Sequence, residues 1–175
     1  TFIERVEDME GNILYKKDVD NELVLNESYT YILNEMMTST YNSAFIDYST
    51  PTVMSIASKI SNKYAIKTGS SGTDCWMVGY NPNVLMLVWN GYDDNRELAV
   101  KDGAISKNIW VDTVENLSIK KSWYEMPDNV IGIPLNSITG EVSEDNNKTS
   151  IFYYVNGSEY HNQDTEFVYK EKTTE

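Results

Sequence analysis

The fold of this chain is decided by three apolar segments, YAIKT (64–68), CWMVGY (75–80) and VLMLVW (84–89). The turn-forming residues Asn-Pro-Asn (81–83) join the second segment to the third. A strand with one solvated face alternates apolar and polar residues, and the last two segments lack that alternation. We therefore predict three extended strands, of which the last two are central strands with helices over both faces.

Apolar residues at helical spacing flank these strands. Upstream, a helix capped by Asn26 is predicted to run to about Thr40, and a shorter helix is predicted to begin at Thr50, because proline follows as its first helical residue. Downstream, the same spacing predicts a helix over residues 104–117. The stripes expected to face the core are Tyr29, Ile32, Leu33, Met36 and Met37 in the first helix, Val53, Ile56, Ala57 and Ile60 in the second, and Ile109, Trp110, Val114 and Leu117 in the third.

Both ends of the chain are predicted to be rich in strand. Residues 2–15 contain two extended patterns around Gly11, which indicates a β-hairpin. The character changes near residue 126, where strands are predicted at 130–135 and 151–155 around a polar loop. The charged end after Tyr169 is expected to fray.

Composition excludes several classes of function. The chain has 175 residues, 27 acidic and 14 basic, and the net charge of −13 repels phosphate backbones, so a nucleic-acid partner is not expected. Cys75 is the only cysteine and His161 the only histidine, which excludes an intramolecular disulfide, a cysteine- or histidine-rich metal site and a Ser-His-Asp triad within the chain. The sequence has no run of about 20 apolar residues, the length that a membrane-spanning helix needs.

The sequence with most functional content begins at Lys67-Thr68-Gly69, followed by Ser-Ser-Gly-Thr (70–73). The tripeptide alone is weak evidence of function, but residues 67–82 resemble the third active-site motif of penicillin-binding proteins. The continuation VWNGYDDNR (88–96) resembles the bifunctional class A members in particular. Weaker likeness at 5–13, 133–140 and 152–159 extends the resemblance over nearly the whole chain.

The resemblance implies a serine D,D-transpeptidase, which cross-links peptidoglycan stem peptides through an acyl-serine intermediate and binds penicillin. It implies that Lys67 supplies positive potential and that the hydroxyls of Thr68 and Ser70 bind the substrate carboxylate. Gly69 lets the substrate backbone lie against the strand, and the Ser70 N–H supplies half of the oxyanion hole. The family usually carries threonine where Ser70 stands; serine keeps the hydroxyl. Asp74 is expected to tie the loop to the next strand, and Trp76 to be a core group.

The other two family motifs, Ser-x-x-Lys and Ser-x-Asn, should precede Lys-Thr-Gly. Residues 1–66 contain neither, so we expect both motifs before Thr1 and no activity from this chain alone. Two matches occur in the wrong order, Ser106-Lys107-Asn108 and Ser118-Ile119-Lys120-Lys121. We interpret both as chance patterns, and the alternative is a circularly permuted domain.

The resemblance also implies the architecture and the setting. We expect an α/β (α+β) fold, a mainly antiparallel sheet flanked by helices, with the C-terminal part of a transpeptidase domain over 1–125 and a β-rich extension over 126–175. Implied partners are a stem peptide or β-lactam and the N-terminal part of the same domain. The implied location is the bacterial cell envelope, on the extracellular face of the cytoplasmic membrane, held by an N-terminal anchor. No metal or organic cofactor is expected.

Two alternative functions stay open. The chain could be a non-catalytic module that binds peptidoglycan or another envelope protein. A sugar-binding β-domain has only the aromatic content, 13 Tyr and 4 Trp, in its favour.

Overall fold

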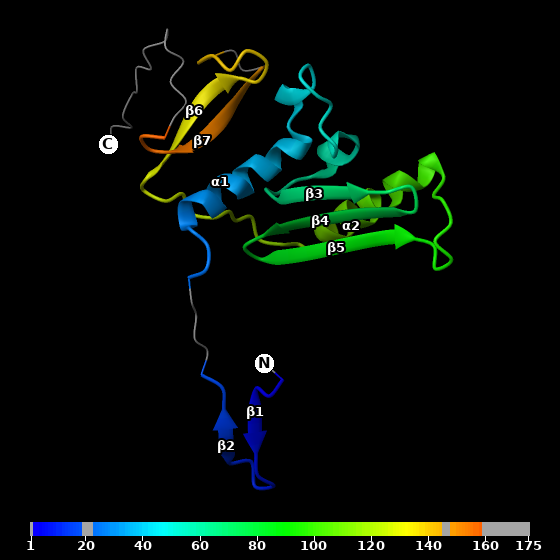
Figure 1. The fold of residues 1–175 in the computed structure, drawn as a ribbon, viewed down its shortest axis with the longest axis vertical. Coiled ribbons are helices and arrows are strands. Elements are labelled where there is room, and N and C mark those ends of the chain that lie inside the picture. Colours follow the sequence, from blue (N-terminus) through cyan, green and yellow to red (C-terminus); the bar gives the residue numbers. More distant parts are fainter. Residues whose placement is uncertain (1, 19–22, 145–147, 159–175) are drawn as a thin grey trace.

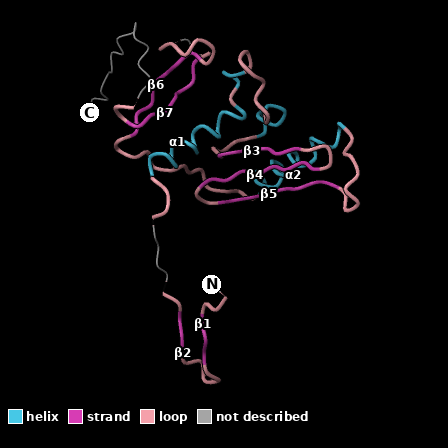
Figure 2. Tube along the Cα trace, viewed as in Figure 1, coloured by secondary structure: helices cyan, strands magenta, loops and turns pink. Residues whose placement is uncertain are grey.

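The structure is a computed structural model that describes residues 2–18, 23–144 and 148–158. Strands in these ranges pair antiparallel in three separate sheets, and helices accompany them (Figures 1 and 2). This agrees with the predicted fold class. In chain order the elements are β1 (Arg5–Glu7), β2 (Ile13–Lys16), α1 (Glu27–Thr38), the 3-10 helices η1 (Ser39–Tyr41), η2 (Ser43–Phe45) and η3 (Met54–Lys59), β3 (Ala65–Ser70), β4 (Asp74–Asn81), β5 (Val84–Gly91), the 3-10 helix η4 (Val100–Ala104), α2 (Ile105–Asn116), β6 (Val130–Asn136) and β7 (Thr149–Val155).

The three predicted strands form the largest sheet, in the order β3-β4-β5. The Asn81 side chain accepts hydrogen bonds from the backbone N–H groups of Asn83 and Val84, at 2.9 and 3.2 Å, which closes the β4–β5 turn. Because β4 lies between its two neighbours, β3 is an edge strand with one unpaired side.

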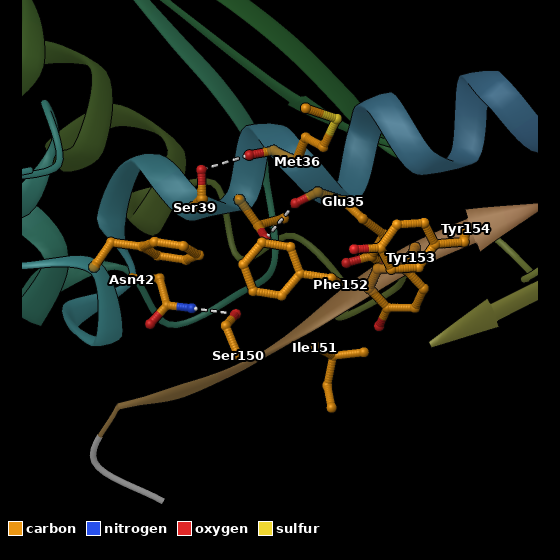
Figure 3. A pocket seen from close by; sticks show the side chains of 11 residues that line it. Glu35, Met36, Ser39, Asn42, Ser150, Ile151, Phe152, Tyr153 and Tyr154 are labelled. Atoms are coloured by element: carbon orange, nitrogen blue, oxygen red, sulfur yellow. Dashed lines mark hydrogen bonds between the residues drawn. The ribbon is translucent and has the colours of Figure 1, made fainter. Parts of the chain in front are cut away.

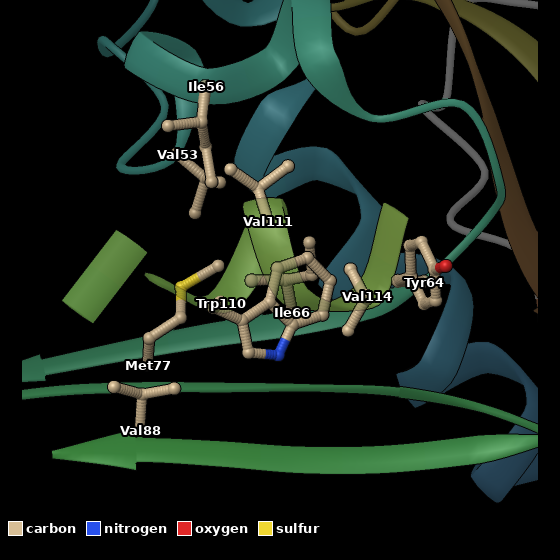
Figure 4. Packing of buried hydrophobic residues seen from close by; sticks show 9 residues of the cluster. All are labelled: Val53, Ile56, Tyr64, Ile66, Met77, Val88, Trp110, Val111 and Val114. Carbon is tan, nitrogen blue, oxygen red and sulfur yellow. The ribbon is translucent and has the colours of Figure 1, made fainter. Parts of the chain in front are cut away.

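One face of this sheet packs against α2 and carries the core. Trp110 of α2 is fully buried, and its indole donates to the Met86 carbonyl at 3.1 Å. Its ring lies against Gly79, where an added Cβ would overlap the indole, and meets Tyr64 edge to face at 5.1 Å. Figure 4 shows this cluster, which comprises Val53, Ile56, Tyr64, Ile66, Met77, Val88, Trp110, Val111 and Val114.

On the opposite face α1 lies against β3, and the β4–β5 side is open, so helices cover this face only in part and less than predicted. Trp76 is 43% exposed and Leu87 is 54% exposed, and Leu85 and Trp89 are exposed as well. Trp76 is therefore not the core group that was predicted. Both faces of these strands are apolar, so the sequence does not reveal which face is covered.

Helix α1 begins where predicted, because the Asn26 side chain accepts the Tyr29 N–H at 3.2 Å. The predicted inward stripe is wrong: Tyr29, Leu33 and Met36 are exposed. The buried residues of the helix are Ser28, Tyr31, Asn34 and Glu35. This face is stable when buried because its polar groups have partners; for example, the Tyr80 hydroxyl donates to Asn34 at 2.8 Å.

The other two predicted helices differ in detail. The segment after Pro51 forms the 3-10 helix η3, which begins only at Met54. Val53, which precedes it, and Ile56 within it are buried as expected. Helix α2 buries Trp110, Val111 and Val114, whereas Ile109 and Leu117 are exposed, contrary to the prediction.

The predicted N-terminal hairpin is present, and the two strands predicted after residue 126 are present and pair with each other. In β1–β2 every strand residue is exposed. The β6–β7 hairpin packs on α1, with Tyr153 edge to face on Tyr31 at 5.6 Å and the Asn42 side-chain amide donating to Ser150 at 3.0 Å. His161 and the predicted fraying end lie outside the described residues, and the division near residue 125 stays a prediction.

Candidate functional site

Within the described residues, no strand pairs with the outer edge of β3 at the predicted site. The Ser71 N–H donates to the Asp74 carbonyl at 2.9 Å, so these two residues form a hydrogen-bonded pair at the end of the β3–β4 ladder. Hydrogen-bonded and non-bonded pairs alternate in antiparallel strands. The pairs of Ser70 with Cys75 and of Thr68 with Met77 are therefore non-bonded, which directs the N–H and C=O groups of Ser70 and Thr68 outward. A peptide could pair with this edge.

The side chains of the motif divide between the two faces of the sheet. Thr68 and Ser70 stand on the same side as Met77 and the covering helix α2, and Lys67 stands on the open side, opposite Val78. The Lys67 side chain is exposed, and its ammonium donates to the Thr68 carbonyl at 2.7 Å. Because that carbonyl points outward, the Lys67 charge lies close to the free edge.

A cavity of about 400 Å³ opens between the end of β3 and the start of α2. Thr68, Gly69 and Ser70 form one wall, with Cys75 and Trp76 of β4 beside them. Thr52, Gly103, Ser106 and Lys107 form the opposite side. Three of the four predicted site residues thus line one cavity, and Lys67 is not among the lining residues.

Gly69 leaves space on the strand surface. A Cβ added there would meet only the Trp76 side chain, at 3.5 Å, which is ordinary contact. Internal packing therefore does not require glycine at this position. The expected reason, close approach of a ligand backbone, remains a prediction.

The turn after β3 is held by Asp74, as the sequence predicts. Its carboxylate accepts hydrogen bonds from the Trp89 indole at 2.9 Å, from Thr73 at 2.7 Å and from Ser71 at 3.1 Å. These bonds, the indole bond first, lower the pKa of Asp74. The Leu98 N–H also donates to the Gly72 carbonyl at 2.9 Å, so the end of the site is tied to the chain that follows β5.

The wrong-order Ser-x-Asn match lies at this cavity without forming the motif. Ser106 is 1% exposed and lines the cavity, whereas Asn108 is exposed and is not one of the lining residues. Residues two apart on an α-helix point about 200° apart, so both side chains cannot face one ligand. Ser118, in the other match, follows α2 with a positive φ of 50°.

Sequence reasoning missed the side of the cavity contributed by Thr52, Gly103, Ser106 and Lys107. Thr52 precedes η3, Gly103 lies in η4, and the other two open α2. No local pattern links them to the Lys-Thr-Gly strand. Only the packing of α2 under β4, fixed by Trp110 against Gly79, brings them together.

A second cavity, of about 370 Å³, lies between α1 and β7 (Figure 3). Its walls include Phe45, Phe152 and Tyr153, and Glu35 lies in it with 7% exposure. The Glu35 carboxylate accepts from the Lys63 ammonium and the Trp123 indole, each at 2.7 Å. Its charge is thus compensated within the protein. The arrangement is that of a structural ion pair that joins α1 to the sheet.

Comparison with known proteins places this geometry in a family, although no family model matches the chain. Penicillin-binding protein 2D of Bacillus subtilis is 32% identical over 164 residues, which cover 91% of this chain and 24% of that protein. Penicillin-binding protein 1A of Aquifex aeolicus is 24% identical over 166 residues, 91% of this chain and 22% of that protein. The chain belongs to the penicillin-binding proteins. It corresponds to a fragment of their transpeptidase domain, as the resemblance predicted, and spans about a quarter of the length of these relatives.

The structure also resembles the fold of a solved penicillin-binding protein. The crystal structure of penicillin-binding protein 1A from Haemophilus influenzae superimposes with a TM-score of 0.66 at 17% identity, over 90% of this chain and 29% of that one. At this identity the likeness concerns the fold alone.

The described residues contain neither a membrane-spanning helix nor a group of metal ligands. Neither α-helix is long and apolar enough to cross a membrane. Within the same residues, no three His, Cys, Asp or Glu side chains are grouped to hold a metal ion.

Proposed function

We propose that this chain is the part of a peptidoglycan D,D-transpeptidase that holds the carboxylate end of the stem peptide. The observation that carries the proposal is the cavity lined by Thr68, Gly69 and Ser70 at the free edge of β3. Hydroxyl groups, open backbone N–H groups and a nearby ammonium are the chemistry that a peptide carboxylate needs. The relationship to penicillin-binding proteins supports a peptide or a β-lactam as the ligand.

Each motif residue has a role in this proposal. The Thr68 and Ser70 hydroxyls donate hydrogen bonds to the substrate carboxylate. The outward N–H of Ser70 stabilises the oxyanion that forms when the scissile carbonyl is attacked. Lys67, whose ammonium is held at the Thr68 carbonyl, adds positive potential to the edge.

The nucleophile in this proposal is a serine of a Ser-x-x-Lys motif upstream of Thr1. The open face of the sheet, with exposed Trp76, Leu87 and Trp89, offers an apolar surface for the part of the domain that carries it. The proposed location of the whole protein is the extracellular face of the cytoplasmic membrane, in the cell envelope.

Labelling with a fluorescent penicillin, followed by mapping of the adduct, tests the proposal. A polypeptide that includes the upstream motifs should be labelled, with the adduct on a serine before Thr1, and the 175-residue chain alone should stay unlabelled. An adduct on Ser118 would establish the permuted alternative instead. If no polypeptide is labelled but the chain alone binds a D-Ala-D-Ala peptide in titration calorimetry, the non-catalytic module is the better account.

A further inference from the structure

The cavity beside β3 contains a cation that belongs to no recognised motif. Lys107 stands in the first turn of α2 and lines the cavity on the side opposite Ser70. Among the described residues that line the cavity, it is the one that carries a charge. A cavity with four hydroxyl side chains, one ammonium and no lining carboxylate favours an anionic ligand.

Local contacts hold the Lys107 ammonium without neutralising it. The Nζ atom donates to the Thr52 carbonyl at 2.7 Å, and the residue is half-buried. An ammonium has three donors, so this bond leaves two for a ligand. Lys59, Lys63 and Lys148 each pair with a carboxylate, whereas no ion pair of Lys107 is found within the described residues. Within the described residues, the Lys107 ammonium is thus available to an anion that enters the cavity.

Lys67 and Lys107 lie on opposite sides of the β3-β4-β5 sheet. Lys67 comes from the open face and is held at the Thr68 carbonyl, and Lys107 comes from the face that α2 covers. The Thr68 and Ser70 hydroxyls lie on the side of Lys107. A carboxylate bound in the cavity would thus share it with the Thr68 and Ser70 hydroxyls and the Lys107 ammonium, and Lys67 would be on the other side of the strand.

We propose that Lys107 is a second cation for the terminal carboxylate of the substrate, and that it determines specificity for a free carboxylate over an amide. This inference rests on the proposed function and adds a residue that the Lys-Thr-Gly motif does not contain. Lys107 contributes to binding of the ligand and takes no part in the acyl transfer itself.

The test uses the longer polypeptide with the upstream motifs, and compares Lys107→Gln and Lys107→Arg with the wild type. The matched control is Lys101→Gln, an exposed lysine on η4, six residues away in sequence. Acylation is followed with a penicillin that has a free carboxylate and with the same penicillin as its carboxamide. Stopped-flow kinetics separates initial binding from the acylation step.

With the free carboxylate, Lys107→Gln should weaken initial binding about tenfold, the effect expected for one charge-assisted hydrogen bond, and leave the acylation step within about twofold. Lys107→Arg should keep most of the affinity, and Lys101→Gln should match the wild type. With the carboxamide, the wild type and Lys107→Gln should react alike.

Two results would overturn the inference alone: an active wild type whose affinity for the carboxylate is unchanged by Lys107→Gln, or an equal loss with carboxylate and carboxamide, which would indicate a structural role. A wild type that neither penicillin acylates would overturn the proposed function, and this inference with it.

Discussion

The two faces of the β3-β4-β5 sheet are equally apolar in sequence and differ in what covers them. On one face, Met77 and Val88 are buried under Trp110 of α2. On the other, Trp76, Leu87 and Trp89 of the same two strands are exposed. The first face completes a core within this chain, and the second has the composition of a core without its covering residues. Such a patch marks a surface for another element, which in our account is the rest of the transpeptidase domain.

The largest difference between the faces should appear on removal of one tryptophan from each. Trp110→Ala should lower the free energy of unfolding of the chain by about 3–5 kcal/mol, because it empties a fully buried site and removes the indole bond to Met86. Trp76→Ala, on the open face, should cost well under half as much. Urea unfolding followed by circular dichroism measures both, and equal costs would mean that the faces do not differ as described.

A buried ion pair contributes to holding α1 at the β3 side of the sheet. Lys63→Met leaves the Glu35 carboxylate buried without its cation, and should destabilise the chain by about 1–3 kcal/mol. The double variant Glu35→Gln/Lys63→Met should recover much of that loss. If the single and double variants unfold at the same urea concentration, the ion pair does not hold α1 to the sheet.

Two glycines of the sheet allow the packing to be tested by the addition of one methyl group at each. Gly79→Ala places its Cβ inside the Trp110 ring and should cost about 1–3 kcal/mol, whereas Gly69→Ala has room beside Trp76 and should be close to neutral for stability. The comparison of their melting temperatures is direct, because both residues lie in the same sheet. A neutral Gly79→Ala would show that the α2 face is loosely packed.

Alkaline pH should weaken the contacts around α1. Burial, and then the neighbouring Glu35, raise the pKa of the Tyr31 phenol above its usual value, and burial raises that of Tyr153. A raised pKa in the folded state favours the neutral phenol, so the stability it contributes is present below the ordinary tyrosine pKa of about 10 and is lost as pH rises beyond it. The urea concentration at the midpoint of unfolding should be lower at pH 11 than at pH 9, and the decrease should be smaller in Tyr31→Phe. An equal decrease in both proteins would contradict this assignment.

The smallest effect on the chain itself is expected at the centre of the open face. Leu87→Ser should change the free energy of unfolding by no more than about 0.5 kcal/mol, because the side chain is already exposed. In the longer polypeptide the same substitution should lower the melting temperature clearly. A large loss in the isolated chain would show that Leu87 is covered there.

The sequence predicted the positions of the strands well and the covering of their faces poorly, and the roles of the site residues remain predictions. Strand positions follow from apolar runs and from turn residues such as Asn81, and these signals are local. The open face was missed because Leu87 and Trp89 are as apolar as buried residues, so the pattern does not distinguish a covered face from an open one. The inward face of α1 was missed because it contains the polar residues Asn34 and Glu35. Their side chains can be buried because they bond with Tyr80 and Lys63, which lie far away in sequence. The part of the cavity contributed by Lys107 was missed for the same reason.

The central claim is that the edge of β3 holds the substrate carboxylate for acyl transfer to a serine outside this chain. The most direct measurement is the second-order rate of penicillin acylation of the longer polypeptide with Thr68→Val, against Thr139→Val in the β6–β7 connection as the control. Our account predicts a loss of at least about tenfold for Thr68→Val, with unchanged circular dichroism, and no loss for the control. An acylation rate that Thr68→Val leaves unchanged would contradict it.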